Sequence, residues 1–318
     1  MQSSGTAARK SIAPQKDGRL FTLKRNIPYL LMMLIPSALL LVFNYWPMIG
    51  LSMAFQNYRT GAPFLSASTQ WVGMKWFETF LHNPMAGRLI RNTLLLNVYS
   101  ILVSFPACIM LALTLNELRS RKLKKFATNV SMLPYFISTV VVVGIMVNFL
   151  SVDNGIINNL IASLGGAKKD FMGSTKWFRT LYVLSGVWQG TGFSAMIYTA
   201  AIAGIDPTLY EAAAIDGCSR FKCMYKITIP CIMPTIMIML ILSIGGLFSS
   251  GVDKILLMYS PAIYETADTL GTYTYRAGVI DGKISLSTAV GLFNGVCNVI
   301  LLVLANWGSR KATESSLF

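Results

Sequence analysis

Six long runs of apolar residues constrain what this chain can fold into. They are predicted over residues 27–53, 93–115, 126–150, 181–203, 229–247 and 284–307. About 20 apolar residues are enough to carry a helix across a hydrocarbon core of ~30 Å. Charged residues make up only 13% of the 318 residues, far below the share in soluble domains. The sequence therefore predicts an all-α polytopic membrane protein with six transmembrane helices, and excludes a disordered chain or a disulfide-rich secreted scaffold.

Three of these runs contain residues that interrupt a helix. Pro106 lies in the second run, Pro134 in the third, and the stretch Trp188–Gly192 in the fourth. Backbone breaks persist in a membrane only where neighbouring helices or a cavity satisfy the freed polar groups. We therefore expect these three runs inside a helix bundle rather than facing lipid alone.

The positive charges predict the orientation. The net charge is +14, but the lysines and arginines lie in short groups between apolar runs and do not form the single basic patch of a nucleic-acid binder. More than half of them fall in residues 1–26, 119–125, 220–226 and 310–311. Such residues concentrate on the cytoplasmic side of a membrane. We expect cytoplasmic tails over 1–26 and 308–318, with a transmembrane domain over 27–307 whose first run is a retained anchor.

The segment between the fourth and fifth runs, residues 206–230, carries clear helix punctuation. Asp206 is a good N-cap, and Pro207 suits the first position of a helix. Gly217 can take the left-handed conformation that ends a helix, and Pro230 marks the entry to the next run. The segment predicts an αα-hairpin on the cytoplasmic surface that docks a soluble partner. A loop lying on anionic lipid is the alternative, but the acids of this segment balance its bases.

The same segment resembles the EAA loop of the permease subunits of bacterial ATP-binding-cassette importers. The family pattern is E-A-A-x3-G-x9-I-x-L-P. Glu211-Ala212-Ala213, Gly217, Ile227 and Pro230 reproduce it, and Ile229 stands where the family favours leucine. Residues 71–77, residues 177–230 and the closing region from Gly251 read like the carbohydrate branch of that family, close to its polysaccharide or oligosaccharide permeases. The resemblance implies the type I importer permease (MetI-like) bundle in a bacterial cytoplasmic (inner) membrane.

The resemblance also implies roles for the residues of the hairpin. Glu211 would pair with a basic residue of a cytoplasmic ATPase subunit. Ala212 and Ala213 would allow close helix approach, Gly217 would make the turn, and Asp216 would help to fix it. Pro230 completes the motif at the entry to the fifth run.

Partners and cofactors follow from the same resemblance. The chain would form one half of a pore with a second permease, as a heterodimer, and would meet two ATPases inside and an extracytoplasmic sugar-binding protein outside. No G-x4-G-K-[ST] pattern occurs in the sequence. The chain is therefore expected to be no enzyme by itself and to hold no cofactor, with ATP and Mg²⁺ bound by the partner ATPases.

The substrate path is predicted from polar and aromatic residues inside the runs. Trp188, Gln189, Tyr198 and Asn294 could bind a sugar through aromatic faces and amide hydrogen bonds. The alternative is that they join helices within the bundle. The segment 248–283, rich in tyrosine and containing Asp253, Asp268 and Arg276, could contact a binding protein or the sugar, or could only cover the end of the bundle.

The sequence disfavours a catalytic site and a metal site in this chain. Glu211 and Asp216 are five residues apart on a helix, so they do not form a catalytic carboxylate pair. Cys218, Cys223 and Cys231 lack metal-site spacing, so no metal is expected. Alternatives that remain are an importer permease for a non-sugar solute, an ion-driven secondary carrier and a membrane-embedded transferase.

Overall fold

The computed structural model describes residues 19–58, 61, 70–249 and 251–313. In this part the chain is almost entirely helical, and an isolated β-bridge joins Gln56 to Trp71. The predicted all-α class is confirmed. Two compact units can be distinguished, residues 1–52 and 53–318.

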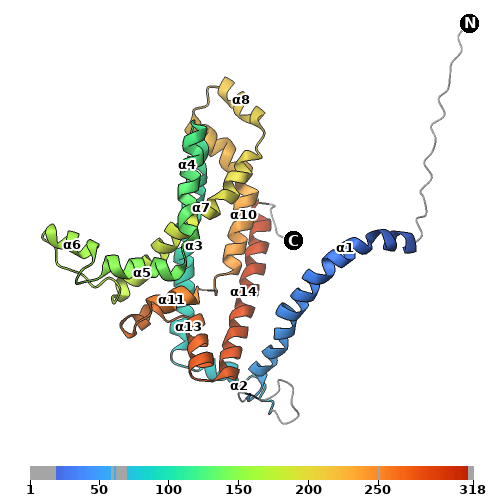
Figure 1. Cartoon of the computed structure of the whole chain (residues 1–318), viewed down its shortest axis with the longest axis vertical. Helices are drawn as coiled ribbons and strands as arrows, with labels where there is room; N and C mark the ends of the chain where they lie inside the picture. Colours follow the sequence, from blue (N-terminus) through green and yellow to red (C-terminus); the bar gives the residue numbers. More distant parts are fainter. Residues whose placement is uncertain (1–18, 59–60, 62–69, 250, 314–318) are drawn as a thin grey trace, which may run out of the picture. The chain divides into compact units, whose positions relative to one another are not determined.

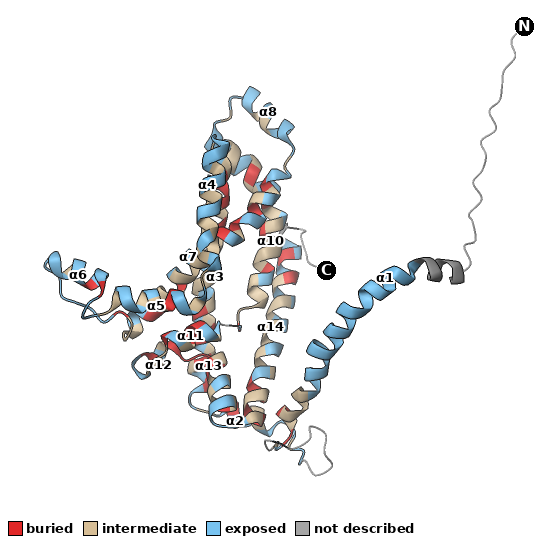
Figure 2. Cartoon of the chain, in the orientation of Figure 1, coloured by how far each residue is buried: buried red, intermediate tan, exposed pale blue. Residues whose placement is uncertain are grey.

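The first unit is dominated by helix α1 (Arg19–Leu40). It continues through a π-helical turn, η1 (Leu41–Tyr45), into a 3₁₀ helix, η2 (Trp46–Phe55). Every residue from 26 to 49 is exposed within the unit, although nearly all are apolar (Figure 2). A helix that is apolar all round is suited to lipid or to the interior of a larger assembly. This matches the first predicted run.

The second unit is built around four long helices (Figure 1). These are α3 (Ala86–Glu117), α7 (Thr175–Ala203), α10 (Ile229–Gly245) and α14 (Ile284–Thr313). Helix α3 packs along α7, and α10 packs along α14. A core cluster that includes Ala112, Tyr198 and Ile232 joins α3, α7 and α10. The connection between α7 and α10 stands at one end of this bundle and consists of α8 (Pro207–Ile215), α9 (Arg220–Cys223) and the π-helical turn η4 (Met224–Thr228).

The predicted third run, residues 126–150, is not one straight helix. Helix α4 (Arg121–Met132) and a 3₁₀ turn, η3 (Leu133–Phe136), are followed after a short break by α5 (Thr139–Leu150), and the two parts meet at 92°. Pro134 in η3 cannot donate a backbone hydrogen bond, which weakens the helix at this point. The Ser138 hydroxyl then accepts from the Val141 N–H at 3.4 Å and caps the new helix.

Within the described residues, four helices are long and apolar enough to cross a membrane. They cover 26–55, 86–117, 220–245 and 284–311, and the bent pair would be a fifth. They match four of the predicted runs, with the second starting at Ala86 instead of residue 93 and the sixth continuing to Lys311. Helix α7 covers the predicted fourth run and is long enough to cross a membrane. It is not among these four helices because its glycine and hydroxyl residues and Gln189 lower its mean hydropathy.

The end of the second unit opposite the α8 hairpin is closed by short helices. They are α2 (Lys75–Leu81), α11 (Val252–Met258), η5 (Pro261–Ile263), α12 (Tyr264–Ala267), α13 (Leu270–Tyr275) and the π-helical turn η6 (Arg276–Ile280). Phe80 of α2 packs against Phe293 of α14, with ring centroids 5.8 Å apart. Ile255 of α11 packs with Val143 and Phe178 in a second cluster. Helix α6 (Ile156–Ser163) follows α5 and packs on it.

Candidate functional site

The first helix of the hairpin begins as its sequence predicts. The Asp206 carboxylate accepts a hydrogen bond of 2.9 Å from the backbone N–H of Thr208, and Pro207 occupies the first helical position. Hydrogen bonds from the backbone and side chain of Thr208 lower the pKa of Asp206. The N-cap is therefore charged at neutral pH, where it also complements the positive end of the helix dipole.

The turn of the hairpin is made by backbone bonds around Gly217. The N–H of Cys218 donates to the Ala213 carbonyl at 2.9 Å, and the N–H of Gly217 donates to the Ala214 carbonyl at 3.1 Å. This pair of bonds is the Schellman motif, which needs a left-handed residue. Gly217 has φ +69°. Asp216 takes part through its backbone N–H, which donates to the Ala212 carbonyl at 3.1 Å.

The second half of the hairpin runs without a break into the bundle. Helix α9, η4 and α10 form one continuous helix from Arg220 to Gly245. Pro230 therefore lies inside this helix, near the start of α10, and does not separate it from the hairpin. The wider π-helical turn at Met224–Thr228 directly precedes Pro230. Such a turn relieves the clash between a proline ring and the carbonyl four residues earlier.

Two side-chain contacts tie the hairpin to the helices below it. The hydroxyls of Tyr210 in α8 and Thr228 in η4 share a hydrogen bond of 2.9 Å. Arg220 at the start of α9 lies 3.7 Å from Glu117, the last residue of α3. A surface pocket of 490 Å³ lies between the hairpin and the end of α3, with Tyr210 and Arg220 among its lining residues.

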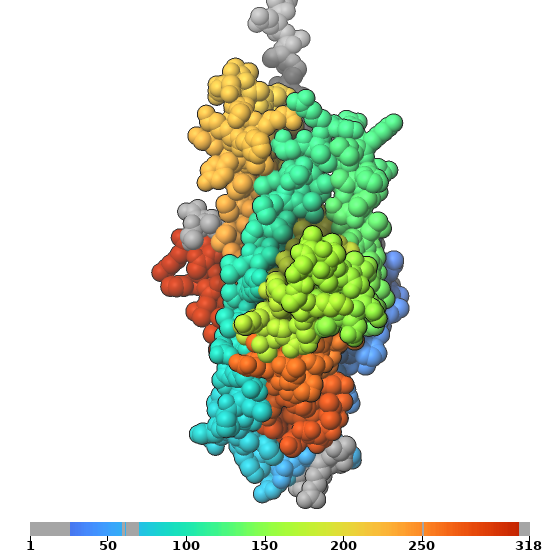
Figure 3. Space-filling model, turned by 90° about the vertical axis from the view of Figure 1, so that its left-hand side faces the viewer, coloured from blue at the N-terminus to red at the C-terminus, as the bar shows by residue number. Residues whose placement is uncertain are grey.

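The hairpin carries exposed apolar side chains. Neither α8 nor α9 contains a buried residue. Ile215 is 88% exposed and Phe221 is 81% exposed. Figure 3 shows the hairpin, in yellow, projecting beside the green end of α3 and α4. Apolar surface of this kind in a soluble environment is typical of an interaction site.

The residues predicted to couple to an ATPase lie together on this hairpin. Glu211 and Ala212 are exposed on α8, and Ala213 is half-buried. Asp216 and Gly217 are exposed at the turn, and Pro230 is exposed where η4 joins α10. The first five of these residues thus lie on one arm and at the turn of the hairpin, whereas Pro230 lies beyond it in α10. The role of each residue in coupling stays a prediction.

The four residues predicted for the substrate path have different surroundings. Trp188 is 51% exposed, whereas Tyr198 is buried and meets Phe105 edge to face at 6.1 Å. Gln189 donates to the Ile137 carbonyl at 2.7 Å and so closes the break between α4 and α5. Asn294 lies on α14, and its side-chain oxygen is buried without a hydrogen-bond partner among the described residues. Contact of these residues with a sugar stays a prediction.

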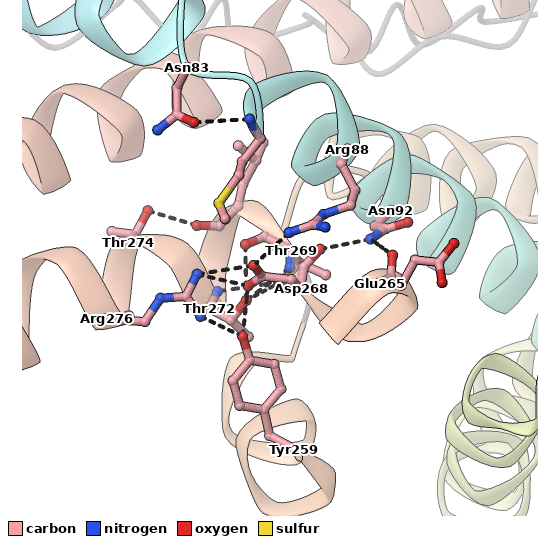
Figure 4. Close-up of polar contacts among 12 residues, drawn as sticks. Asn83, Arg88, Asn92, Tyr259, Glu265, Asp268, Thr269, Thr272, Thr274 and Arg276 are labelled. Atoms are coloured by element: carbon pink, nitrogen blue, oxygen red, sulfur yellow. Dashed lines mark hydrogen bonds and ion pairs between the residues drawn. The ribbon is translucent and has the colours of Figure 1, made fainter. Parts of the chain in front are cut away.

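A polar network closes the opposite end of the bundle (Figure 4). The Asp268 carboxylate, 1% exposed, accepts two hydrogen bonds from Arg276, at 3.0 and 3.3 Å. The Tyr259 hydroxyl donates to Asp268 at 2.8 Å and accepts from Arg276 at 2.6 Å. Burial and the bond to Asp268 raise the pKa of Tyr259 to about 12. In this arrangement Asp268 and Arg276 are bonded to each other and hold the short helices together. Contact of segment 248–283 with a binding protein or a sugar stays a prediction.

One residue in this region has a structural role that the sequence analysis missed. Asn92 of α3 donates to the backbone carbonyls of Glu265 and Asp268, at 2.8 and 3.0 Å, and accepts from Arg179 of α7 at 3.0 Å. It thereby connects α3 and α7 to the short helices. Asn92 lies just before the predicted run 93–115, and its partners are more than 80 residues away in sequence, so no local pattern marks it.

The comparisons with known proteins decide the family. A family described as "Binding-protein-dependent transport system inner membrane component" matches residues 104–313, which include α7, the hairpin and α10. The chain belongs to this family. The predicted resemblance to importer permeases of the carbohydrate branch is confirmed, and the chain is a multi-pass membrane transport component.

Proteins similar to this chain include permeases of transport systems for sugar polymers. The chain is 40% identical over 306 residues to a polygalacturonan/rhamnogalacturonan transport system permease protein, YteP, of Bacillus subtilis, covering 96% of this chain and 94% of the relative. It is 27% identical over 300 residues to an arabinooligosaccharides transport system permease protein, AraP, of the same species, covering 93% and 91%. The chain is also similar to a solved structure, a bacterial alginate ABC transporter in complex with an alginate pentasaccharide-bound periplasmic protein. The alignment has a TM-score of 0.86 and 38% sequence identity, and it covers 94% of this chain and 100% of that chain. These findings support a sugar or polysaccharide ABC transporter permease.

Proposed function

We propose that this chain forms one half of the translocation pore of an ATP-driven importer that carries an oligosaccharide across the cytoplasmic membrane by alternating access. A second permease chain would supply the other half. Two ATPase subunits, which bind ATP and Mg²⁺, would dock on the hairpin ends, and a binding protein would deliver the sugar at the opposite end. Both termini of the chain would be cytoplasmic, in agreement with the distribution of lysine and arginine.

One observation carries the coupling role of the hairpin. The hairpin is exposed, its helix α8 is capped at both ends, and its second half continues as α10 without a break. Coupling needs a contact surface and a stiff connection to the moving helices. The exposed side chains of Ile215 and Phe221 supply apolar surface on the same hairpin as Glu211, and the bond between Tyr210 and Thr228 joins both halves of the hairpin.

In the proposed cycle, ATP binding closes the two ATPases and draws the hairpins of both permeases together. Movement of each hairpin is carried directly into α10, and the pore opens toward the binding protein to accept the sugar. Hydrolysis of ATP returns the hairpins, and the pore opens inward. The oligosaccharide assignment is supported by the names of the relatives, which include transporters of polygalacturonan, rhamnogalacturonan and arabinooligosaccharides.

The test is affinity purification of the chain from its native cell in mild detergent, with mass spectrometry of the proteins that accompany it. We expect an ATPase and a second permease. A Glu211→Ala and Gly217→Pro double variant should lose the ATPase and keep the second permease, whereas Lys283→Ala, an exposed residue at the opposite end, should keep both. A chain that purifies alone and moves solute into vesicles without ATP would show that the proposal is wrong.

A further inference from the structure

Helix α4 has three faces with different surroundings. The inner face packs against α7 and α3, and it consists of the half-buried residues Lys124, Ala127, Thr128 and Ser131. These positions recur every three or four residues, so they lie on one side of the helix. The two remaining faces are exposed, and one of them is apolar while the other is mainly basic.

The apolar face extends over the length of α4 and into η3. It consists of Leu123, Phe126, Val130 and Leu133, which are between 45% and 66% exposed. From Leu123 to Leu133 this face is about 15 Å long. The bent pair of α4 and α5 is apolar enough to count as one membrane span. The apolar face is therefore suited to the hydrocarbon of a membrane rather than to water.

The basic face lies at the first turns of α4. Arg121, Lys122 and Lys125 are exposed, and so is Arg119 directly before the helix. None of these four side chains forms an ion pair with an acid among the residues that the structure describes. The face thus presents four positive charges without a counter-charge from the described part of the chain.

The neighbouring sequence supplies no acid that balances these charges. Residues 118–152 contain no aspartate or glutamate, and Glu117 directly before them lies 3.7 Å from Arg220 of α9. The hairpin differs in this respect, since its acids balance its bases. Within α4, the like charges of Arg121 and Lys125 lie one turn apart, and basic residues in the first turn meet the positive end of the helix dipole. These charges therefore destabilise the helix unless anions outside this chain lie beside them.

The basic face lies at the end of the bundle that carries the hairpin (Figure 1). The Lys124 ammonium donates to the side chain of Asn116 near the end of α3 at 3.3 Å, and Glu117 of α3 contacts Arg220 of the hairpin. In the proposed function this end is cytoplasmic. The basic residues of α4 are then at the level of the cytoplasmic headgroups, and its apolar face continues into the hydrocarbon. Lysine and arginine at the end of a span can reach the headgroups while their aliphatic stems cover apolar surface.

Anionic phospholipid fits this combination of faces better than a protein partner does. A soluble ATPase cannot cover an apolar face that continues into the membrane. The core of a protein interface is depleted of lysine, whereas lysine and arginine beside an apolar helix face are typical of binding to an anionic lipid surface. A phospholipid supplies both chemistries in one molecule, because its phosphate pairs with guanidinium and ammonium groups and its acyl chains cover apolar side chains.

We propose that the basic face of α4 binds the headgroups of anionic phospholipids in the cytoplasmic leaflet, while its apolar face lies against the acyl chains of these lipids. The choice of leaflet rests on the orientation in the proposed function, whereas the binding of anionic lipid rests on α4 itself. Bound lipid holds this end of α4 at the level of the headgroups, directly beside the hairpin.

The test is site-specific photocrosslinking in the intact complex, purified through this chain and reconstituted in liposomes. The liposomes contain equal amounts of phosphatidylglycerol and phosphatidylcholine with the same acyl chains. The photoreactive residue p-benzoylphenylalanine is incorporated at Phe126, which is 66% exposed, and mass spectrometry identifies the adducts. Phosphatidylglycerol adducts should exceed phosphatidylcholine adducts by about fivefold or more, since each basic residue near an anionic surface contributes roughly a fivefold factor. The excess should decrease at about 1 M salt, where the Debye length falls to ~3 Å.

Substitution of the basic face tests whether its charges cause the excess. A variant with Arg121→Gln, Lys122→Gln and Lys125→Gln should give both adducts in nearly equal amounts. It should assemble with normal yield, because these exposed side chains form no ion pair within the described chain and glutamine favours helices.

The matched control removes three exposed lysines between α6 and the first turn of α7 and should keep the excess of phosphatidylglycerol adducts; its substitutions are Lys168→Gln, Lys169→Gln and Lys176→Gln. Equal amounts of both lipid adducts with the native basic face, or an excess that persists in the α4 variant, would overturn the inference. Adducts chiefly with the second permease or with the ATPase would overturn it as well and would assign α4 to a subunit interface.

The same photoreactive residue at Phe221 of the hairpin tests the proposed function separately. An adduct with the ATPase would support that function, and its absence would contradict it. The ratio of the two lipid adducts at Phe126 decides the inference about α4 in either case.

Discussion

The hydroxyl of Tyr210 lies 2.9 Å from the hydroxyl of Thr228, and this bond closes the α8 hairpin onto the helix that continues as α10. Thr228 is buried, and Tyr210 is half-buried. The two residues are 18 positions apart in sequence, on opposite arms of the hairpin. In the proposed cycle, a displacement of α8 would pass to α10 through this side-chain contact as well as through the turn.

Tyr210→Phe should weaken this coupling. The variant loses a hydrogen bond with a net contribution of about 1 kcal/mol and keeps the aromatic packing. We expect assembly with the ATPase to continue, with more ATP hydrolysed per sugar transported in proteoliposomes. Thr228→Val should have the same effect, and the double variant should be no worse than either single one. Strictly additive losses in this cycle would mean that the two hydroxyls do not act together.

The effect of a substitution at Gly217 should depend on the backbone conformation that the new residue can adopt rather than on the size of its side chain. A Cβ atom at this position would meet no atom within 4 Å, so the only cost is the positive φ. Gly217→Asn should keep most of the ATPase in co-purification, since asparagine adopts this conformation, and Gly217→Ala should be weaker by about 1 kcal/mol. Gly217→Pro, whose φ is fixed near −65°, should lose the ATPase. Wild-type recovery of the ATPase with the proline variant would contradict this account of the turn.

Gly192→Ala should destabilise the bundle strongly. A Cβ atom on Gly192 would overlap the backbone carbonyl of Ser131, where α7 crosses α4, and backbone atoms cannot move aside easily. We expect a loss of about 3 kcal/mol, measured by thermal denaturation in detergent. Gly190→Ala on the same helix is the matched control, because its Cβ atom would meet nothing within 4 Å. Similar melting temperatures for the two variants would disprove the close approach.

Asp268→Asn should destabilise the end of the bundle opposite the hairpin. The substitution leaves Arg276 without its charged partner and disturbs the bond from Tyr259. The expected loss is about 3 kcal/mol, at the lower end for broken buried ion pairs because Arg276 is partly exposed. Asp281→Asn breaks only an exposed contact of 3.8 Å with Lys283 and should cost less than about 1 kcal/mol. Denaturation curves of both variants provide the comparison.

Features determined by local sequence could be predicted well. Asp206, Pro207 and Gly217 act within one or two helical turns, and the structure has them as N-cap, first helical residue and left-handed turn. The apolar runs were recognised for the same reason. Pro230 is the instructive exception: a proline usually separates helices, but the π-helical turn before it lets the helix continue.

Features that depend on distant partners could not be predicted. The 92° bend after η3 was signalled by Pro134, whereas the bond from Gln189 of α7 to the Ile137 carbonyl joins residues 52 positions apart, which no local pattern shows. The burial of Lys254 on α11 was not predicted because a lysine in a segment rich in polar residues is normally solvated. Only the packing of α11 against α5 and the bond from its ammonium to the Tyr182 carbonyl reveal that its charge is buried.

The unbroken helix from Arg220 to Gly245 has a consequence for the timing of the transport cycle. Its 26 residues correspond to about 39 Å, comparable with the thickness of a bilayer. A helix of this length transmits a displacement from one end to the other, and it can bend at the π-helical turn Met224–Thr228 and at Pro230 and Pro234. In the proposed cycle the far end of α10 would therefore follow the hairpin directly unless the helix bends at these sites.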